Sequence, residues 1–335
     1  MGRGGALVAG TLAVLAASTP AAAGTPEGAL FVAGKRGNTL SKVDLATGAE
    51  VLRVASCTNP HELATSPDGK HVALACYGGT SIDIFRSDTL EKVRSIDLGA
   101  NARPHGIVWQ QDEELGRDTI YATAEGRKAM FVVDYPLGED PDILEIPTGK
   151  DGSHMIAVSP DGALAWTMDM GSGTVTLIEV MDARALRSAA VGVEPEGIAL
   201  APDGKTLWVS ARGSDTVFAL DPMTLDIRAE VATGRFPLRI AVRPQGDVAV
   251  TSDLQDGSLS VIDTATAKVI RTIPVSSPAE AEKRFQVTIL WSKDGNRIYV
   301  AETASDTVAE VDYAAGTVLR RFTAGEGGDG MAILP

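Results

Sequence analysis

The sequence has only two cysteines, Cys57 and Cys76, and this scarcity excludes several cofactor sites. It has no Cys-x-x-Cys-His motif for haem attachment and no paired Cys-x-x-Cys pattern for zinc. A Walker A loop and a Gly-x-Ser-x-Gly elbow are absent as well. The chain therefore lacks the common motifs of haem attachment, nucleotide hydrolysis and serine-hydrolase chemistry.

Positive charge is in the minority, with 30 Lys and Arg against 44 Asp and Glu, which gives a net charge of -14. Such a chain should be repelled by phosphate backbones and by anionic membranes. Aromatic residues make up 5% of the chain and form no aromatic-plus-basic runs of the kind that bind single strands. We therefore expect no nucleic-acid partner, and the acidity favours solubility or cationic ligands.

Long apolar runs are absent after the N-terminal segment. That segment has Arg3, a short apolar stretch at 6–17 and the small-residue run Ala21–Ala23, which together are typical of a signal peptide. The apolar stretch is too short for a confident membrane span, and no cysteine follows the cleavage position to carry a lipid. We expect a signal peptide at 1–23 and a periplasmic or secreted protein without membrane insertion.

A turn of the form Pro-Asp-Gly, or a close variant, recurs along the chain and marks an internal repeat. Proline and glycine provide the backbone angles of a tight turn, and Asp can bond its own backbone two residues on. Three copies begin at a constant spacing of 42 residues, at Ser159, Ala201 and Arg243, and others begin at Ser66 and Ser292. This spacing fits one four-stranded unit for each turn.

Each unit contains short, β-branched segments bounded by Gly, Pro, Asp or Ser, which predicts strands. One unit has them at 197–200, 206–210, 216–220 and 226–231. Acidic residues close the third strand in six units, where we expect them to bond turns: Asp44, Asp134, Glu179, Asp221, Asp263 and Asp312.

The ends of the chain indicate a closed ring. The repeat pattern begins in a second strand at 29–33 and stops in a first strand at 330–334, so the last strand can complete the first sheet. The sequence therefore predicts an all-β fold, a single seven-bladed β-propeller of four-stranded blades at 24–335.

The repeat resembles that of the YVTN, or YncE-like, β-propeller family. The likeness is clearest at 192–210 (GVEPEGIALAPDGKTLWVS) and 257–266 (GSLSVIDTAT) and covers nearly the whole mature chain. It implies the propeller fold. Members and distant relatives include binding proteins, surface-layer proteins, subunits of redox enzymes, lactonases and a lyase, so the likeness implies no single function.

Three of the four histidines stand at the same place in three successive units. His61, His105 and His154 each open a first strand, and Glu196 takes that place in the next unit. In a propeller these positions meet at one mouth of the central channel, in a ring with Leu238, Val287 or Gln286, and Asp329. Imidazoles suit zinc, copper or iron, so we expect a transition-metal or small-ligand site at His61, His105, His154 and Glu196; the alternative is a polar funnel without a metal.

Other charged residues belong to the same face of the predicted ring. Arg103, Arg239 and Asp329 are candidates for binding an anionic or polar substrate. Glu196 or Glu302 would act as a base if the site were catalytic. A metal-dependent enzyme that opens lactones, eliminates a group or oxidises its substrate is thus an alternative to a periplasmic binding protein.

Cys57 lies four residues before His61, and Cys76 ends the second strand of the same unit. A disulfide between them is expected in an oxidising compartment, with copper ligation by a thiolate as the alternative. A third functional hypothesis is a propeller subunit of a quinoprotein-type dehydrogenase, which would need a protein partner in the periplasm.

Overall fold

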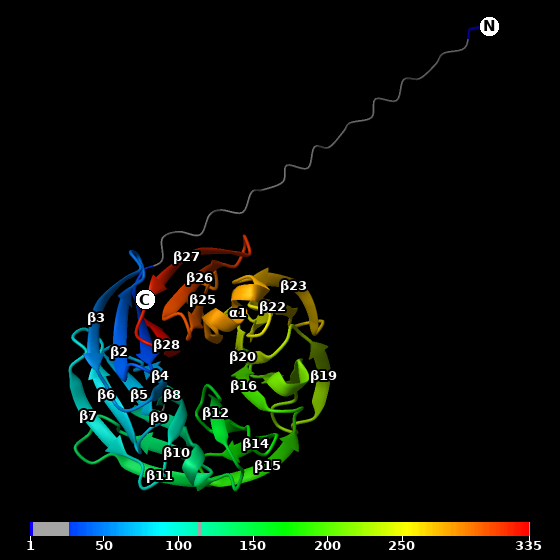
Figure 1. Ribbon diagram of the computed structural model, residues 1–335. Helices are drawn as coiled ribbons and strands as arrows, with labels where there is room; N and C mark the ends of the chain where they lie inside the picture. Colours follow the sequence, from blue (N-terminus) through cyan, green and yellow to red (C-terminus); the bar gives the residue numbers. More distant parts are fainter. Residues whose placement is uncertain (3–26, 113–115, 335) are drawn as a thin grey trace.

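The computed structural model describes residues 1–2, 27–112 and 116–334, which form seven four-stranded antiparallel sheets arranged in a ring (Figure 1). The predicted seven-bladed β-propeller is confirmed. From residue 3 onward, the predicted signal peptide lies outside the described residues. Within the described part of the chain, no helix is long and apolar enough to cross a membrane.

Each blade begins with its innermost strand and ends with its outermost strand. Blade 1 contains β28 (Gly328–Leu334), β1 (Ala29–Gly34), β2 (Thr39–Asp44) and β3 (Ala49–Ala55). Blade 2 contains β4 (Pro60–Thr65), β5 (His71–Cys76), β6 (Ser81–Arg86) and β7 (Lys92–Asp97). Blade 3 contains β8 (Pro104–Asp112), β9 (Arg117–Ala124), β10 (Ala129–Asp134) and β11 (Asp142–Pro147).

The other four blades repeat this arrangement. Blade 4 contains β12 (Ser153–Val158), β13 (Leu164–Asp169), β14 (Thr174–Glu179) and β15 (Arg184–Ala190). Blade 5 contains β16 (Pro195–Leu200), β17 (Leu207–Ala211), β18 (Thr216–Leu220) and β19 (Ile227–Ala232). Blade 6 contains β20 (Pro237–Val242), β21 (Val248–Asp253), β22 (Ser258–Asp263) and β23 (Lys268–Pro274), and blade 7 contains β24 (Gln286–Trp291), β25 (Arg297–Glu302), β26 (Thr307–Asp312) and β27 (Thr317–Thr323).

The ring closes as expected, through pairing of the last strand with the first. β28 runs antiparallel to β1, with Ala29 opposite Leu334 and Phe31 opposite Ala332. This pairing covers the inner edge of β1, so the two ends of the chain hold the ring together.

Apolar side chains between neighbouring blades form the core. Trp166, Trp208 and Tyr299, from the second strands of three blades, are fully buried or nearly so. Four of the six predicted turn acids bond their turns; for example, an oxygen of Asp221 accepts the N–H groups of Met223 and Thr224, each at 2.8 Å. Asp134 and Glu179 accept hydrogen bonds from the side chains of Arg117 and Arg184. These contacts explain how a repeat with few aromatic residues still forms stable blades.

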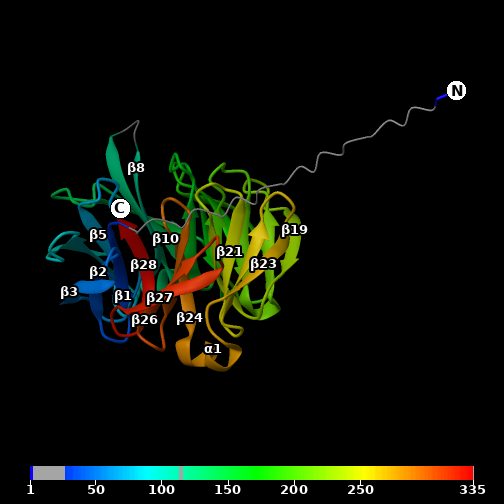
Figure 2. The same cartoon turned by 90° about the horizontal axis from the view of Figure 1, so that it is seen from above.

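Short helical segments lie at the strand ends. Two 3-10 turns, η1 (Glu125–Arg127) and η2 (Arg212–Ser214), follow second strands. The helix α1 (Pro278–Arg284) connects blade 6 to blade 7 and lies on one face of the disc, whereas β8 extends toward the other face (Figure 2). The repeat pattern did not predict α1.

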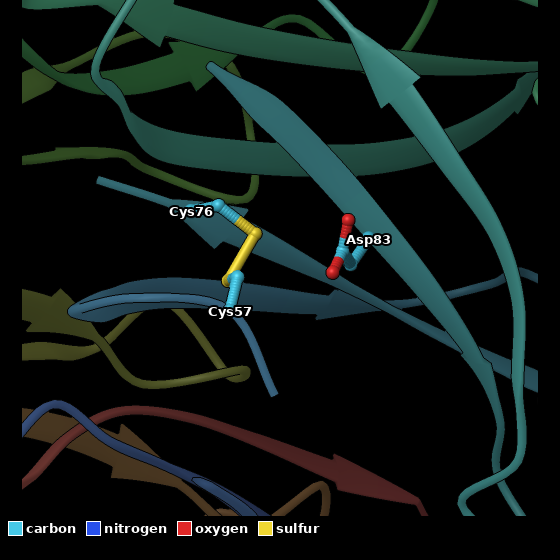
Figure 3. Close-up of side chains that lie close together, drawn as sticks. All are labelled: Cys57, Cys76 and Asp83. Carbon is cyan, nitrogen blue, oxygen red and sulfur yellow. A yellow bond between two sulfur atoms is a disulfide. The ribbon is translucent and has the colours of Figure 1, made fainter. Parts of the chain in front are cut away.

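Cys57 and Cys76 form a disulfide, as predicted, with their Cα atoms 5.6 Å apart (Figure 3). The bond ties the segment before β4 to the end of β5. Disulfides are typical of proteins that function outside the cytoplasm.

Candidate functional site

Two backbone features recur where each first strand begins. The residue two places before each ring residue has a left-handed conformation, with φ between 49° and 68°: Asn59, Arg103, Gly152, Glu194, Phe236, Phe285 and Gly327. In all seven blades the pairing register between the first and second strands shifts at or next to the ring residue, as in a β-bulge, for example between Pro60 and Leu63. Bulges re-aim side chains, and here they accompany side chains that line the channel mouth.

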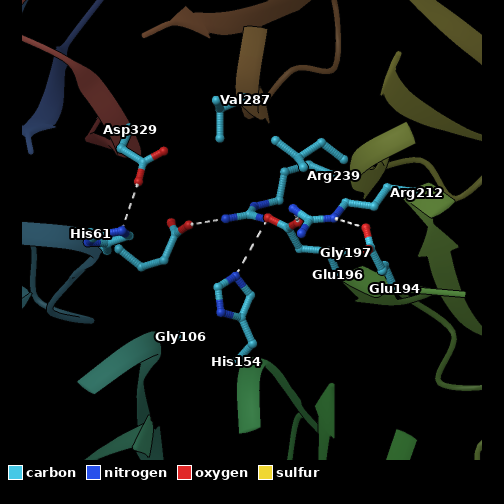
Figure 4. Close-up of polar contacts among 12 residues, drawn as sticks. His61, Gly106, His154, Glu194, Glu196, Gly197, Arg212, Arg239, Val287 and Asp329 are labelled. Atoms are coloured by element: carbon cyan, nitrogen blue, oxygen red, sulfur yellow. Dashed lines mark hydrogen bonds and ion pairs between the residues drawn. The ribbon is translucent and has the colours of Figure 1, made fainter. Parts of the chain in front are cut away.

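The predicted ring residues meet around one cavity of about 180 Å³ at the channel mouth. They come from all seven blades: His61, His105, His154, Glu196, Leu238, Val287 and Asp329. The sequence left the ring residue of blade 7 undecided between Val287 and Gln286. Val287 lines the cavity, whereas Gln286 is buried and donates to the carbonyl of Ser258 at 2.6 Å. Figure 4 shows Val287 across the cavity from His154.

The three histidine rings lie side by side. The ring centroids of His105 and His154 are 3.6 Å apart with an interplanar angle of 31°, and those of His61 and His105 are 4.8 Å apart. Tyr77 contacts this group, with its ring centroid 4.4 Å from that of His61. Blades 2 to 4 thus contribute one continuous group of rings.

Nδ1 is anchored in two of these histidines. Nδ1 of His154 bonds a carboxylate oxygen of Glu125, and Nδ1 of His61 lies 3.0 Å from the carbonyl oxygen of Asn59. Glu125 is itself held by the Tyr77 hydroxyl, which donates to it at 2.7 Å. Nε2 is therefore the nitrogen that these two rings direct toward other partners: Asp329 at 3.8 Å from His61, and Glu196 at 3.5 Å from His154 (Figure 4).

The histidines differ in protonation because their surroundings differ. Burial lowers the pKa of His61, and burial together with the neighbouring imidazoles holds the pKa of His105 well below its usual value. Burial also disfavours the imidazolium of His154, but Glu125 and Glu196 outweigh it and raise the pKa. The group therefore combines neutral rings with one ring that favours its proton.

Arg239 forms the floor of the cavity. Its guanidinium pairs with Glu196 and, at 3.0 Å, with Glu62 of blade 2, and all three side chains are nearly inaccessible to solvent. Burial opposes ionisation of Glu196, yet Arg239, His154 and Arg212 lower its pKa to about 2. Burial raises the pKa of Glu62 despite Arg239. These ion pairs connect blade 6 to blades 2 and 5.

Several buried polar atoms around the cavity have no hydrogen-bond partner. They are Oδ1 of Asp329, Nδ1 of His105 and Nε of Arg239, while Nε2 of His154 has only its 3.5 Å contact with Glu196. Buried polar groups are rarely left unpaired, since each costs about 1–3 kcal/mol. Those at the cavity are available to bond a polar ligand there.

The histidines do not form a ready-made metal site. In the described part of the chain, one group of at least three potential ligand atoms lies within 4.8 Å of one another, at Cys57, Cys76 and Asp83. Both of its sulfur atoms belong to the disulfide, so this group lacks free thiolates. His61, His105 and His154 would have to move before they bound one ion together.

The other predicted site residues have separate environments. The side chain of Arg103 is half exposed and stacks on Tyr77, with 4.4 Å between the guanidinium carbon and the ring centroid. Glu302 does not line the cavity and pairs with Arg284 at 3.2 Å and Arg321 at 3.0 Å, so the position offers no free base to a ligand there. Asp329 lines the cavity and pairs with Lys35 at 3.2 Å.

Lys35, Tyr77 and Glu62 were not among the predicted site residues. Lys35 and Tyr77 directly follow the second strands of blades 1 and 2. Second strands return to the face on which first strands begin, so this position in the repeat is the signal that identifies them. Glu62 follows His61 and has no such signal, because only the bulge accounts for its direction.

These features define a seven-bladed β-propeller with a cavity lined by ionisable side chains at one channel mouth. Comparison with protein-family models and with curated protein sequences gives no match, so the resemblance to the YVTN repeat remains a prediction.

Solved structures resemble the chain in fold. A hydrazine synthase chain of Kuenenia stuttgartiensis has 18% identity and a TM-score of 0.74, over 86% of this chain and 93% of that one. A functionally unknown protein of Desulfotomaculum acetoxidans has 15% identity and a TM-score of 0.75, over 92% and 99%. Apo AztD of Citrobacter koseri has 13% identity and a TM-score of 0.64, over 91% and 97%. At these identities the likeness concerns the fold alone.

Proposed function

We propose that this protein is an exported binding protein that takes a small ligand into the cavity at the channel mouth. The observation that carries the proposal is the set of unpartnered buried polar atoms around that cavity. The disulfide supports an oxidising compartment, and the N-terminal sequence pattern supports export to the periplasm or the exterior.

A small organic or inorganic ligand suits the cavity better than a bare transition-metal ion. Lys35, Arg212 and Arg239 are among the lining residues, against the carboxylates of Glu196 and Asp329. Arg212 and Arg239 both bind Glu196, which reduces its availability as a metal ligand. Both carboxylates that line the cavity are therefore already paired with cationic side chains and would balance little of a metal ion's charge.

Zinc, copper or iron binding is the second candidate, and the anchoring of Nδ1 in two histidines favours it. Metal-binding histidines usually hold their second nitrogen against a carboxylate or a carbonyl, as His154 does with Glu125 and His61 with Asn59. His105, kept neutral by burial, would be the third ligand. This candidate requires the rings to rearrange around the ion.

Catalysis is less well supported than binding. Glu196 is a weak base with its pKa near 2, and Glu302 is occupied by two arginines. Glu196 therefore fails the requirement that a general base have a pKa near the working pH, and Glu302 does not line the cavity.

The test is a ligand screen by thermal shift on the untagged, exported protein, with zinc and copper included. We expect compounds that stabilise the wild type to lose their effect in His105→Ala and to keep it in His71→Ala. His71 is the matched control, since it stacks beside Trp109 in blades 2 and 3 and does not line the cavity. Ligands that stabilise the wild type and both variants equally would place binding elsewhere.

A further inference from the structure

The part of the mouth formed by blades 6 and 7 is apolar. Phe236, Leu238, Phe285 and Val287 line the cavity there, and the histidines of blades 2 to 4 line the opposite part. The side chain of Phe285 remains 40% exposed. An exposed ring beside buried polar atoms gives the cavity two chemically distinct sides.

Both phenylalanines occupy the left-handed position that precedes a first strand, with φ of 59° and 54°. Blades 1 and 4 have glycine at this position and blade 2 has asparagine, which adopt the conformation at little cost, whereas blades 3 and 5 have Arg103 and Glu194. A phenyl side chain there costs roughly 1–2 kcal/mol, so the backbone gives no reason for it.

The longest connection between described blades ends at the same wall. The segment between β23 and β24 contains α1, and its last residue is Phe285. Insertions in repeat proteins often concentrate on the binding face. The position of α1 on the face of the cavity therefore supports a recognition role for Phe285 (Figure 2).

Among the charged residues that line the cavity, the more exposed ones are positive. The side chains of Lys35 and Arg212 are 25% and 24% exposed, whereas those of Asp329 and Glu196 are 2% and 6% exposed. Lys35 has three N–H donors and uses one on Asp329. Arg212 lies over the ring of Phe236 at 5.1 Å, and on its outer side it also pairs with Glu194 at 3.3 Å.

From this arrangement we infer that the ligand is a small organic carboxylate with an aromatic or branched hydrocarbon body. The carboxylate accepts hydrogen bonds from Lys35, Arg212 or a neutral imidazole, and the body packs on Phe236 and Phe285. The inference rests on the proposed function, since it names the class of ligand for the same cavity.

Benzoate is the probe, because it combines one carboxylate with a flat apolar body. Titration calorimetry on chelator-treated protein should show benzoate binding at least ten-fold more tightly than acetate, which lacks the body, and than benzylamine, which reverses the charge. Phe285→Asn should weaken benzoate binding at least ten-fold, since asparagine tolerates the left-handed conformation and removes only the ring. Tyr135→Asn is the matched control, because Tyr135 has φ of 52°, is exposed and lies away from the cavity.

Lys35→Met tests the contribution of the Lys35 charge separately from that of packing on the phenylalanines. It should weaken benzoate binding several-fold and leave binding of neutral benzamide unchanged. Tighter binding of benzylamine than benzoate would overturn the inference. Binding of zinc or benzamide at the histidines without benzoate binding would also overturn it while preserving the proposed function. Failure of every probe to bind would overturn both.

Discussion

The two sides of the channel mouth use the same repeat position for different chemistry. In blades 2 to 4 that position carries His61, His105 and His154, held by Glu125, Tyr77 and a disulfide. In blades 6 and 7 it carries Leu238 and Val287, which form a small apolar cluster with Leu254 and Phe236. One side is fixed by hydrogen bonds and a covalent bond, and the other by packing.

This difference shows how a repeat protein builds a site. The left-handed residue and the bulge recur with different side chains, so the backbone places the ring residue of each blade at the channel mouth. Chemistry is then free to vary from blade to blade. Arg239 is the exception that links the two sides, because it begins in blade 6 and reaches Glu62 in blade 2.

The largest expected effect comes from breaking that link. Arg239→Met leaves Glu62 and Glu196 buried without their main partner, which should lower the free energy of unfolding by about 3–5 kcal/mol. Arg212→Met is the control: it removes the other partner of Glu196, but from a part-exposed position, and should cost about 1 kcal/mol or less. Denaturant unfolding measures both, and equal losses would contradict a special role for Arg239.

A smaller loss should follow removal of the disulfide that holds the histidine side. Cys57 and Cys76 are 19 residues apart, and closing a loop of that size stabilises a protein by about 3 kcal/mol. The double variant Cys57→Ser/Cys76→Ser should therefore melt at a lower temperature than the oxidised wild type. Reduction of the wild type should produce a similar shift, and no shift in either case would contradict the role of the bond.

The smallest effects are opposite pH dependences of two neighbouring histidines. The raised pKa of His154 stabilises the fold fully below about pH 6.5, the unfolded value, and this contribution is lost as the pH rises through the folded pKa. The lowered pKa of His105 has the reverse effect, because the unfolded state gains a proton more readily as the pH falls below about 6.5.

Unfolding free energies across pH 5 to 9 for His154→Gln and His105→Gln measure these contributions. The stability of the wild type relative to His154→Gln should decrease as the pH rises. Its stability relative to His105→Gln should decrease as the pH falls. Parallel pH dependences for the two variants would contradict the assignment of a protonated ring beside a neutral one.

The fold was predictable from the sequence because its signals are local and repeated. Recurring turn residues, three of them spaced 42 residues apart, define the blades, and the strand types at the two ends define the closure. The residues at the channel mouth were predictable from the same repeat, because equivalent positions of a closed propeller meet around its central axis. The disulfide followed from two cysteines at the same face of one blade.

The contacts within the site were less predictable because they depend on side-chain reach across blades. Nothing in the sequence indicates that Arg239 pairs with Glu62 rather than with a ligand, or that Arg284 and Arg321 neutralise Glu302. The left-handed positions of Phe236 and Phe285 also depend on the three-dimensional path into each strand. These details turn a predicted metal cluster into a cavity with a polar and an apolar side.

The most direct test is an NMR titration of protein labelled at the histidine rings, with benzoate and then zinc as ligands. Only four histidines are present, and His71 lies outside the cavity, so it serves as an internal reference. A ligand at the channel mouth should shift the signals of His61, His105 and His154 together and leave that of His71 unchanged. Saturable binding that leaves those three signals unchanged would contradict a ligand site at the channel mouth.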